Sequence, residues 1–341
     1  MRSRFTLSRR AALRTVASVP LLAAAVPAAL AQSSDAGLPA GWPAKPVRIV
    51  VGFPAGSATD AVARVMAEQL RQKLGQPFIV ENRPGANGML GAAEVARAPG
   101  DGYTMLMTNS SAITVNHQVY KKITYLPERD FVPLTMVVSA PFIVVVNPAK
   151  ERTANVRTMA DLIALAKAQP GQITYGSGGV GNLAQLGFEL INNQAGIRTA
   201  HVPYKGGAAA QTGLLGGEID VMLDTPPTIA HVKSGRLRAL AVTIPRRLPE
   251  LPDVPTMIES GFPGFDVPFW LGAMMPAQTP PAIVKALYDA MKSVRDDANA
   301  MRQLGLQGTV ELLPPAEFAT RIKSETAMWG EVIRREKIEI E

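Results

Sequence analysis

The chain has 341 residues, 47% of them hydrophobic and 18% charged, a globular composition and a length that suits two domains of ordinary size. It has no cysteine, which excludes disulfides, thiolate metal sites, a cysteine nucleophile and a cysteine-linked lipid anchor. Five of its 35 basic residues fall in residues 1–31, which contain no acid; the remaining 30 basic and 28 acidic residues nearly balance and do not indicate a nucleic-acid partner.

The first 31 residues have the three parts of an export signal: arginines, an apolar run from Val16 to Leu30, and the small-x-small end Ala29-Leu30-Ala31. We therefore predict cleavage near Ala31/Gln32 and a soluble mature chain in the periplasm. The pair Arg9-Arg10, with Leu13 three residues on, resembles a twin-arginine signal. An ordinary secretory signal and an N-terminal membrane anchor are the alternatives, but the apolar run is short for a span of about 20 residues.

The first part of the mature sequence alternates strands and helices. Apolar residues at helical spacing from Val62 to Leu74 predict an amphipathic helix, and Gly75 is placed to end it. The other elements expected here are strands at Val47–Gly52, Phe78–Glu81 and Tyr103–Met107 and a helix near Met89–Arg97. This alternation is typical of a mainly parallel sheet.

A second series of the same kind begins after residues 141–148. Thr158 and Asp161 form a capping-box-like pair that opens a helix over 161–169. The other predicted elements are strands at Ile173–Tyr175, Thr199–Val202, Ile219–Leu223 and Leu237–Thr243 and helices at Leu183–Gln194 and Ala208–Leu215. The proline-rich residues 245–268 should be irregular; a strand at Trp270–Met275, a helix starting at Thr279-Pro280-Pro281 and an amphipathic helix at Pro315–Arg335 follow.

The sequence thus predicts a two-domain α/β protein with mixed, mainly parallel sheets and a ligand cleft between the domains. We expect one domain from residues 32–141 and 253–341 and the other from residues 142–252. The apolar runs at 142–146 and 237–243 are candidate crossings between them.

Two loops, Phe53–Asp60 and Tyr175–Asn182, each follow a predicted strand and precede a predicted helix. Small residues let a ligand approach the main chain, and the helix start offers unpaired N–H groups and the positive end of the helix dipole. Such loops bind anions without a charged side chain, and ligands of parallel sheets sit beyond the carboxyl ends of the strands. Glycine-rich turns are common, however, and neither loop fits a phosphate or dinucleotide motif.

At these residues the chain resembles the Bug family, the TctC-like periplasmic receptors of tripartite tricarboxylate transporters. The resemblance runs from about Pro43 to the end of the chain. The segments that carry it are Pro46–Val51 with Phe53–Gly56, Val80–Ala86, Pro99–Thr104, His201–Gly206, Leu215–Gly217, Leu237–Thr243 and Leu251–Thr256.

The resemblance implies a type II periplasmic-binding-protein-like fold whose cleft closes on a small carboxylate: a di- or tricarboxylate, an acidic amino acid or an aromatic acid. It implies that the loops Phe53–Asp60 and Gly176–Asn182 hold the carboxylate mainly through main-chain N–H groups, and that Asp60 helps to order bridging waters. It also implies membrane permease subunits (TctA/TctB-like) as partners.

The sequence departs from the family pattern at four residues, and the first three of these departures concern ligand identity. Ser57 stands where the family usually has a second glycine, and Asn182 and Gln185 stand where serine and histidine are frequent. Asn87 replaces a glycine in a turn, and asparagine tolerates left-handed geometry nearly as well.

Fourteen residues are predicted to bind ligand: Phe53, Ala55, Gly56, Ser57, Thr59, Asp60, Ser110, Ser177, Gly178, Gly181, Asn182, Tyr204, Lys205 and Asp224. Some have a second interpretation. Asp60 and Asp224 could cap a helix and a turn, Lys205 could be solvated, and the Tyr204 ring could pack locally. His201 lies in a strand and is interpreted as structural.

The sequence argues against an enzyme. Its three histidines lack zinc-binding spacing, no Gly-x-Ser-x-Gly elbow occurs, and Ser177 has no evident base partner. We expect a monomeric transport receptor without metal or cofactor. The alternatives are a sensory receptor that presents the solute to a signalling kinase and an exported hydrolase, which would need a base near Ser177.

Overall fold

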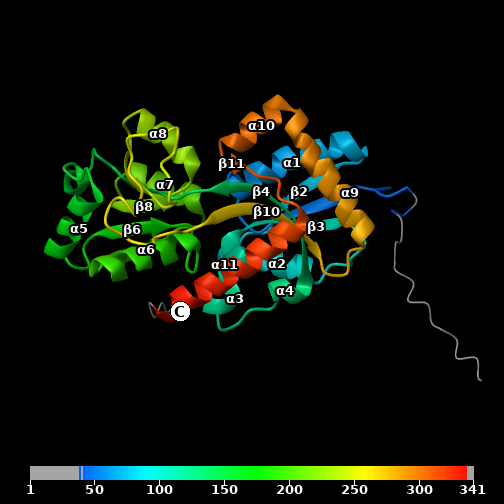
Figure 1. Ribbon diagram of the computed structural model, residues 1–341, viewed down its shortest axis with the longest axis horizontal. Coiled ribbons are helices and arrows are strands. Elements are labelled where there is room, and N and C mark those ends of the chain that lie inside the picture. Colours follow the sequence, from blue (N-terminus) through cyan, green and yellow to red (C-terminus); the bar gives the residue numbers. More distant parts are fainter. Residues whose placement is uncertain (1–37, 40, 336–341) are drawn as a thin grey trace, which may run out of the picture. The chain divides into compact units, whose positions relative to one another are not determined.

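The computed structural model describes residues 38–39 and 41–335, which form two mixed β-sheets covered by helices (Figure 1). The predicted leader and its cleavage point lie outside the described residues.

The first sheet combines parallel and antiparallel strands. Its order is β11 (Thr309–Val310), β4 (Phe131–Ala140), β10 (Phe269–Pro276), β3 (Thr104–Asn109), β1 (Val47–Val51) and β2 (Phe78–Asn82). β1 runs parallel to β2 and β3, whereas β10 runs antiparallel to both β3 and β4. The predicted parallel alternation therefore accounts for one half of this sheet.

Helix α1 (Ala58–Leu74) follows the pattern read from the sequence. Val62, Met66 and Leu70 are fully buried in the core, and Gly75 ends the helix in left-handed geometry, with its N–H on the Arg71 oxygen. The other helices of this part are α2 (Met89–Ala96), α3 (Asn116–Val119), α4 (Pro127–Asp130), α9 (Pro281–Lys292), α10 (Ala298–Gly305) and α11 (Pro315–Arg335), with a π-helical turn at Ser111–Val115.

The second sheet has the order β7 (Ala200–Pro203), β6 (Thr174–Ser177), β8 (Val221–Asp224), β5 (Ile143–Val146) and β9 (Arg238–Val242). β6 is parallel to β7 and β8, and β5 is antiparallel to β8 and β9. Its helices are α5 (Met159–Ala168), α6 (Leu183–Ala195), α7 (Gly207–Leu215) and α8 (Ile229–Lys233). The capping box of Thr158 and Asp161 is present, but α5 begins at Met159, two residues earlier than predicted.

The chain passes between the sheets twice, from β4 to β5 and from β9 to β10. The apolar runs expected to be the crossings are themselves strands β5 and β9 of the second sheet, each next to a crossing. Phe142 and Phe269 lie beside the two passages, and their ring centroids are 5.0 Å apart.

Strand β4 is the main element that the sequence pattern did not predict. Pro133 lies inside it, and proline inside an apolar run argues against a strand. The structure places Pro133 opposite Met274, where the β4–β10 register is irregular and a missing N–H is tolerated.

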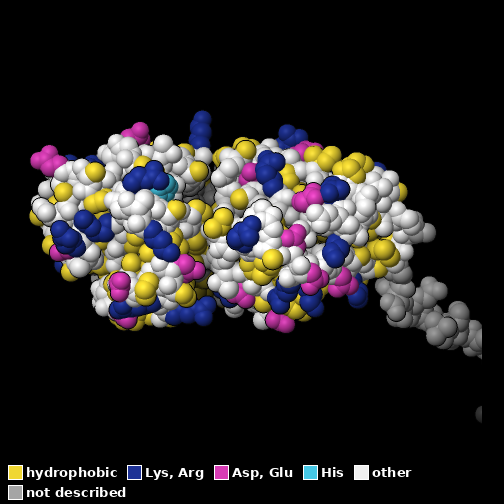
Figure 2. All heavy atoms as spheres, turned by 90° about the horizontal axis from the view of Figure 1, so that it is seen from above, with side chains coloured by type: hydrophobic (Ala, Val, Ile, Leu, Met, Phe, Trp, Pro, Cys, Tyr) yellow, Lys and Arg dark blue, Asp and Glu magenta, His cyan; other side chains and the backbone are white. Residues whose placement is uncertain are grey.

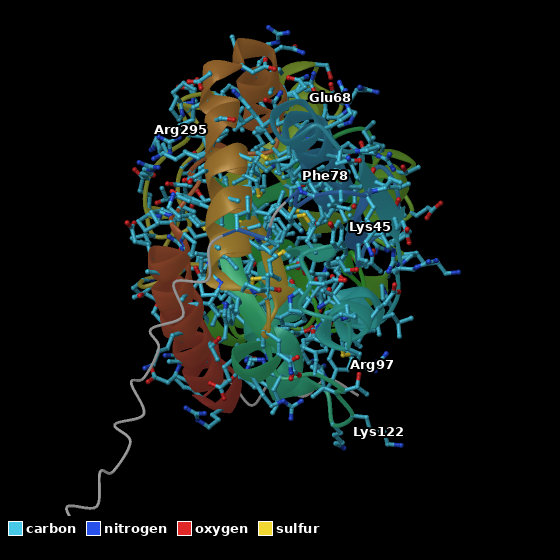
Figure 3. All side chains as sticks on the ribbon, turned by 90° about the vertical axis from the view of Figure 1, so that its right-hand side faces the viewer. Lys45, Glu68, Phe78, Arg97, Lys122 and Arg295 are labelled. Carbon is cyan, nitrogen blue, oxygen red and sulfur yellow. The ribbon has the colours of Figure 1, made fainter. Side chains whose placement is uncertain are left out.

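Charged side chains of both signs are scattered over the face in Figure 2, without a continuous basic stripe there. Figure 3 shows the labelled Glu68, Arg97, Lys122 and Arg295 at the periphery, and all four are exposed. This distribution agrees with the near balance of charge in the sequence.

Candidate functional site

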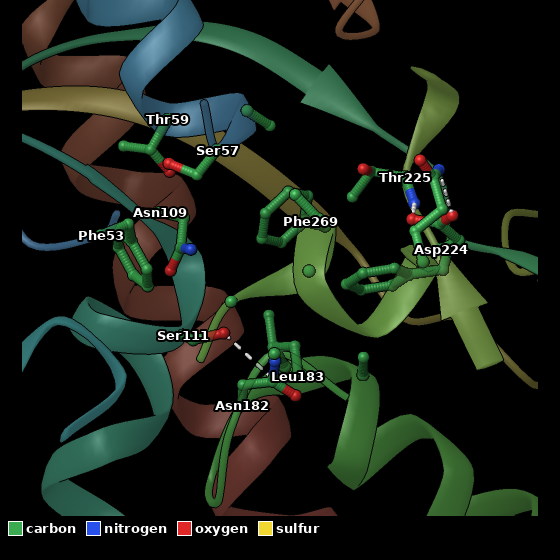
Figure 4. Close-up of a pocket in the computed structure, with 18 of the residues that line it drawn as sticks. Phe53, Ser57, Thr59, Asn109, Ser111, Asn182, Leu183, Asp224, Thr225 and Phe269 are labelled. Carbon is green, nitrogen blue, oxygen red and sulfur yellow. Dashed lines mark hydrogen bonds between the residues drawn. The ribbon is translucent and has the colours of Figure 1, made fainter. Parts of the chain in front are cut away.

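A cavity of about 250 Å³ lies where segments of both sheets meet (Figure 4). Its walls come from the loop before α1, the segment around β3 and its π-helical turn, the starts of α6 and α7, and the end of β8. The predicted residues that line it are Phe53, Gly56, Ser57, Thr59, Gly178, Asn182 and Asp224.

The first wall is the start of α1. Ser57 is the N-cap, with its hydroxyl oxygen accepting from Asp60 N at 3.3 Å, and Ala58 and Thr59 also line the cavity. The first N–H groups of a helix have no carbonyl partner inside it, so this turn directs main-chain donors and the positive helix end at the cavity.

The second wall is the start of α6. Asn182 caps it, with Oδ1 accepting from Gln185 N at 2.9 Å, and Gln185 Oε1 accepts from Gly181 N at 2.7 Å. Leu183 N donates to Ser111 Oγ at 3.0 Å. The side chains of Asn182 and Gln185 thus both accept main-chain N–H groups at the start of this helix.

The third wall is the start of α7, formed by Gly206, Gly207 and Ala208, and the sequence analysis did not assign it to the site. Gly206 N donates to Gly178 O at 3.1 Å, which ties this turn to the loop before α6. The paired glycines after strand β7 and before a helix repeat the signal of the other two loops. That signal could have revealed this wall.

Polar side chains that the sequence analysis did not assign complete the cavity. Asn87, Asn109, Ser111, Gln211 and Thr225 line it, as do the rings of Phe142 and Phe269. Apart from Asn87, which was noted as a replacement of a turn glycine, no local sequence pattern marks these residues, because they reach the cavity through the packing of separate elements.

Asp224 is the one ionisable side chain among the described residues that line the cavity. It is 4% exposed, and its carboxylate accepts from Gln211 Nε2 at 2.7 Å and from Thr225 N at 2.8 Å. Burial raises the pKa of Asp224 to about 6, against the opposing effect of these hydrogen bonds.

Asp60 lies behind the first wall and is not part of the cavity lining. Its buried carboxylate accepts from Gly56 N and from the side chains of Arg64 and Asn82. Burial favours the neutral acid, but these hydrogen bonds outweigh it and hold the pKa of Asp60 below its usual value. In this arrangement Asp60 orders the loop that forms the wall.

The other predicted residues also lie outside the lining. Ser110 Oγ accepts from Trp270 N at 3.3 Å, Tyr204 donates to Glu218 at 2.9 Å, and Gly181 is buried in the loop before α6. Ala55 and Lys205 are exposed.

Ser177 has a partner that the sequence did not reveal. His201 Nε2 lies 2.6 Å from Ser177 Oγ, and burial lowers the pKa of His201. Ser177 is fully buried and is not among the residues that line the cavity. The pair joins β6 to β7 and holds the end of β6, as expected for a structural histidine.

Two further features bear on the class of site. The described chain contains no group of three or more His, Asp or Glu side chains placed to hold a metal ion. Nor does it contain a helix with the length and apolar character needed to cross a membrane.

Two α/β sheets joined by two chain passages, with a polar cavity that both help to line, define a solute-binding protein of the periplasmic type. The chain belongs to the family of tripartite tricarboxylate transporter receptors (TctC), whose model matches residues 62–338. Members of this family are periplasmic solute-binding receptors, not enzymes.

Relatives agree over nearly the same span. BugT of Bordetella pertussis is 34% identical over 296 residues, which cover 86% of this chain and 90% of BugT. The structure of Rpa4515 from R. palustris with adipate is 30% identical, with a TM-score of 0.82, 87% of this chain covered and 99% of that one. MatC from Rhodopseudomonas palustris with bound malate is 28% identical, with a TM-score of 0.80, 86% of this chain covered and 100% of that one.

Proposed function

We propose that this protein captures a small carboxylate in the cavity and delivers it to the permease subunits of a tripartite tricarboxylate-type transporter. The observation that carries the proposal is the convergence of three helix starts, α1, α6 and α7, on a cavity with no cationic side chain among its described lining residues. Such a site attracts negative charge through main-chain dipoles.

The proposed ligand-binding residues are those of the sequence prediction that line the cavity, together with the start of α7. Ser57, Asn182 and Gly207 mark the three helix starts. Asp60 and Ser177 support the walls from behind. We further propose that residues 32–141 with 253–341 and residues 142–252 are the two domains, that the receptor is monomeric, and that it is exported by the predicted leader with cleavage near Ala31/Gln32.

The relatives with adipate and malate make dicarboxylates the first candidates. A thermal-shift screen of residues 32–341, unfolded and refolded beforehand to remove co-purified solute, tests the proposal. The panel holds dicarboxylates, tricarboxylates, acidic amino acids and aromatic acids. A ligand at about 100 times its Kd should stabilise the fold by about 2.7 kcal/mol. Loss of the shift when the carboxylates are replaced by amides would support the anion site; no shift with any acid would contradict it.

Transport and sensing use the same binding event. Reconstituted uptake of the ligand with the cognate permease supports the transport role. If uptake fails while a co-expressed sensor kinase responds to the ligand-loaded protein, the sensory alternative replaces it.

A further inference from the structure

Asp224 is the residue of the described cavity lining whose side chain can carry a negative charge. The three helix starts favour a negative ligand, whereas an ionised Asp224 opposes one. In Figure 4 the Phe269 ring lies between Asp224 with Thr225 on one side and Ser57 with Thr59 on the other. Ser57, Thr59 and Asp224 all line the one cavity, so a ligand with two acidic ends that places one at the start of α1 can place the other at Asp224.

Within residues 38–39 and 41–335, no charged side chain hydrogen-bonds to Asp224. β5, α7 and the turn Pro226–Thr228 carry no titratable side chain. From the other neighbouring elements come Glu189 of α6 and Tyr175 of β6, which hydrogen-bond to each other, and His231 and Lys233 of α8. The groups that act on the pKa of Asp224 are neutral: Gln211, Thr228 and the Thr225 main chain.

Two carboxylates cannot share a buried, uncompensated site while both are ionised, because their repulsion is large where water is excluded. One proton between them replaces the repulsion with an O–H···O hydrogen bond, which is strong when the acceptor is charged. Asp224 needs little free energy to accept that proton, since its burial already favours the neutral acid.

We propose that Asp224 holds the second carboxylate of a bound dicarboxylate as a neutral acid, so that the receptor takes up one proton from solvent with each ligand. The Asp224 hydroxyl donates to the ligand oxygen, and no bond to carbon changes. This inference rests on the proposed capture of a small carboxylate. It adds that the site prefers ligands whose second end is also a carboxylate.

The proposed proton uptake predicts how the Kd of the ligand changes with pH. Below about pH 6 most of the empty receptor already carries the proton, so affinity should change little with pH until the ligand's own carboxylates begin to protonate. Above pH 6 the proton must be supplied on binding, and Kd should rise by up to about tenfold per pH unit. Asp224→Asn keeps the size of the side chain and supplies an amide donor without a proton, so its Kd should be independent of pH between 6 and 8.

Isothermal titration with malate and with adipate at pH 7, in two buffers of different ionisation enthalpy, measures the protons taken up. We expect about one proton per ligand for the natural protein and none for Asp224→Asn. Ser57→Ala is the matched control: it should bind more weakly and still take up one proton.

Binding without proton uptake, or a pH-independent Kd of the natural protein, would overturn this inference and leave the capture of carboxylates intact. This result would indicate that the ligand presents a hydroxyl or ammonium donor to an ionised Asp224. Failure of every dicarboxylate to bind would overturn this inference alone, whereas failure of every acid in the panel would overturn both proposals. If Asp224→Asn does not fold, the proton count of the natural protein decides the question alone.

Discussion

Asn87 and Gly181 are joined by a hydrogen bond of 3.0 Å from the asparagine Nδ2 to the main-chain oxygen, although 94 residues separate them. Two further bonds join the same parts of the molecule: Leu183 N donates to Ser111 Oγ, and Tyr120 donates to Val180 O at 2.5 Å. The loop that begins α6 is thereby fixed to the part of the chain that holds the first sheet, directly at the cavity.

Removing the Asn87 bond should weaken ligand binding. Asn87 has left-handed geometry, with φ of 51°, so Asn87→Gly keeps the main-chain conformation and deletes only side-chain contacts. The same Nδ2 also donates to Oδ1 of the buried Asn116 at 2.8 Å. Loss of the bond to Gly181, worth about 1 kcal/mol, should raise the Kd for malate about fivefold, and loss of the bond to Asn116 should lower Tm. Calorimetric titration measures the affinity.

Tyr120→Phe is the companion variant, because it deletes a second bond to the same loop and leaves the ring in place. It should change the affinity in the same direction. Unchanged affinity in both variants would mean that these bonds do not contribute to the ligand-bound arrangement.

A methyl group at Gly207 should obstruct the cavity without disturbing the fold. Gly207 lines the cavity at the start of α7, and a Cβ there would meet no protein atom within 4 Å. We expect Gly207→Ala to keep its Tm and to lose about tenfold or more in affinity, since an overpacked contact costs about 1–3 kcal/mol. Thermal unfolding with and without ligand separates the two effects.

Gly305→Ala is the control for this variant. Gly305 is also helical, and a Cβ there is likewise unobstructed, but it lies in α10 outside the cavity lining. It should bind as the natural protein does. Equal losses in both variants would show that the effect comes from the added methyl in a helix and not from the cavity.

Ser57 allows the capping and binding roles of one residue to be distinguished. Ser57→Gly should cost only a few tenths of a kcal/mol in stability, whereas Ser57→Ala should cost about 1 kcal/mol. If the hydroxyl also contacts ligand, both variants should lose affinity equally. Urea unfolding measures the stability of the two variants, and titration measures their affinity. If Ser57→Ala loses more affinity than Ser57→Gly, in parallel with its larger loss of stability, the hydroxyl acts only as a helix cap.

Asp220 should make the second sheet sensitive to acid. Its fully buried carboxylate contacts Lys150 Nζ at 2.6 Å and Arg152 Nη1 at 3.2 Å and accepts from Thr174 N. Burial alone would raise the pKa of Asp220, but these partners outweigh burial and lower it. A lowered pKa in the folded state contributes stability that is present above about pH 4 and is lost as the pH falls further.

Asp220→Asn should therefore destabilise the protein by about 3 kcal/mol at pH 7 and by much less at pH 3. Asp289→Asn, which removes an exposed pair with Lys285, is the control and should leave Tm unchanged. The test is to measure Tm of the natural protein and of Asp220→Asn from pH 7 to pH 3. A difference in Tm that stays constant over this range would contradict the prediction.

Local patterns predicted most of the helices and the parallel strands, because each depends on neighbours in sequence. The helical spacing from Val62 to Leu70, the Gly75 end and the Thr158–Asp161 box are all present in the structure. Strand β3 was predicted, but its antiparallel pairing with β10 was not, and strand β4 was not predicted at all. Their pairing is set by distant segments, and Pro133 obscures the pattern of β4.

The cavity was predicted in part for the same reason. Gly56, Ser57, Gly178 and Asn182 follow strands and precede helices, which is a local signal. Asn87, Asn109, Ser111 and Gln211 reach the cavity only through tertiary packing, which no short motif encodes. His201 became the partner of Ser177 through the register of β6 and β7, in which Tyr175 and His201 are opposite each other.

The place of β10 has a consequence for the order of folding. The second sheet is built from one continuous stretch, residues 143–242, so all its strand pairs can form as soon as that stretch is available. The first sheet cannot be completed at that stage, because β10 pairs with both β3 and β4 and brings Leu271 opposite Asn109. Closing so long a loop costs chain entropy before any contact offsets it. The second sheet should therefore fold before the first, and the insertion of β10 should be the step that joins β4 to β3 in the first sheet.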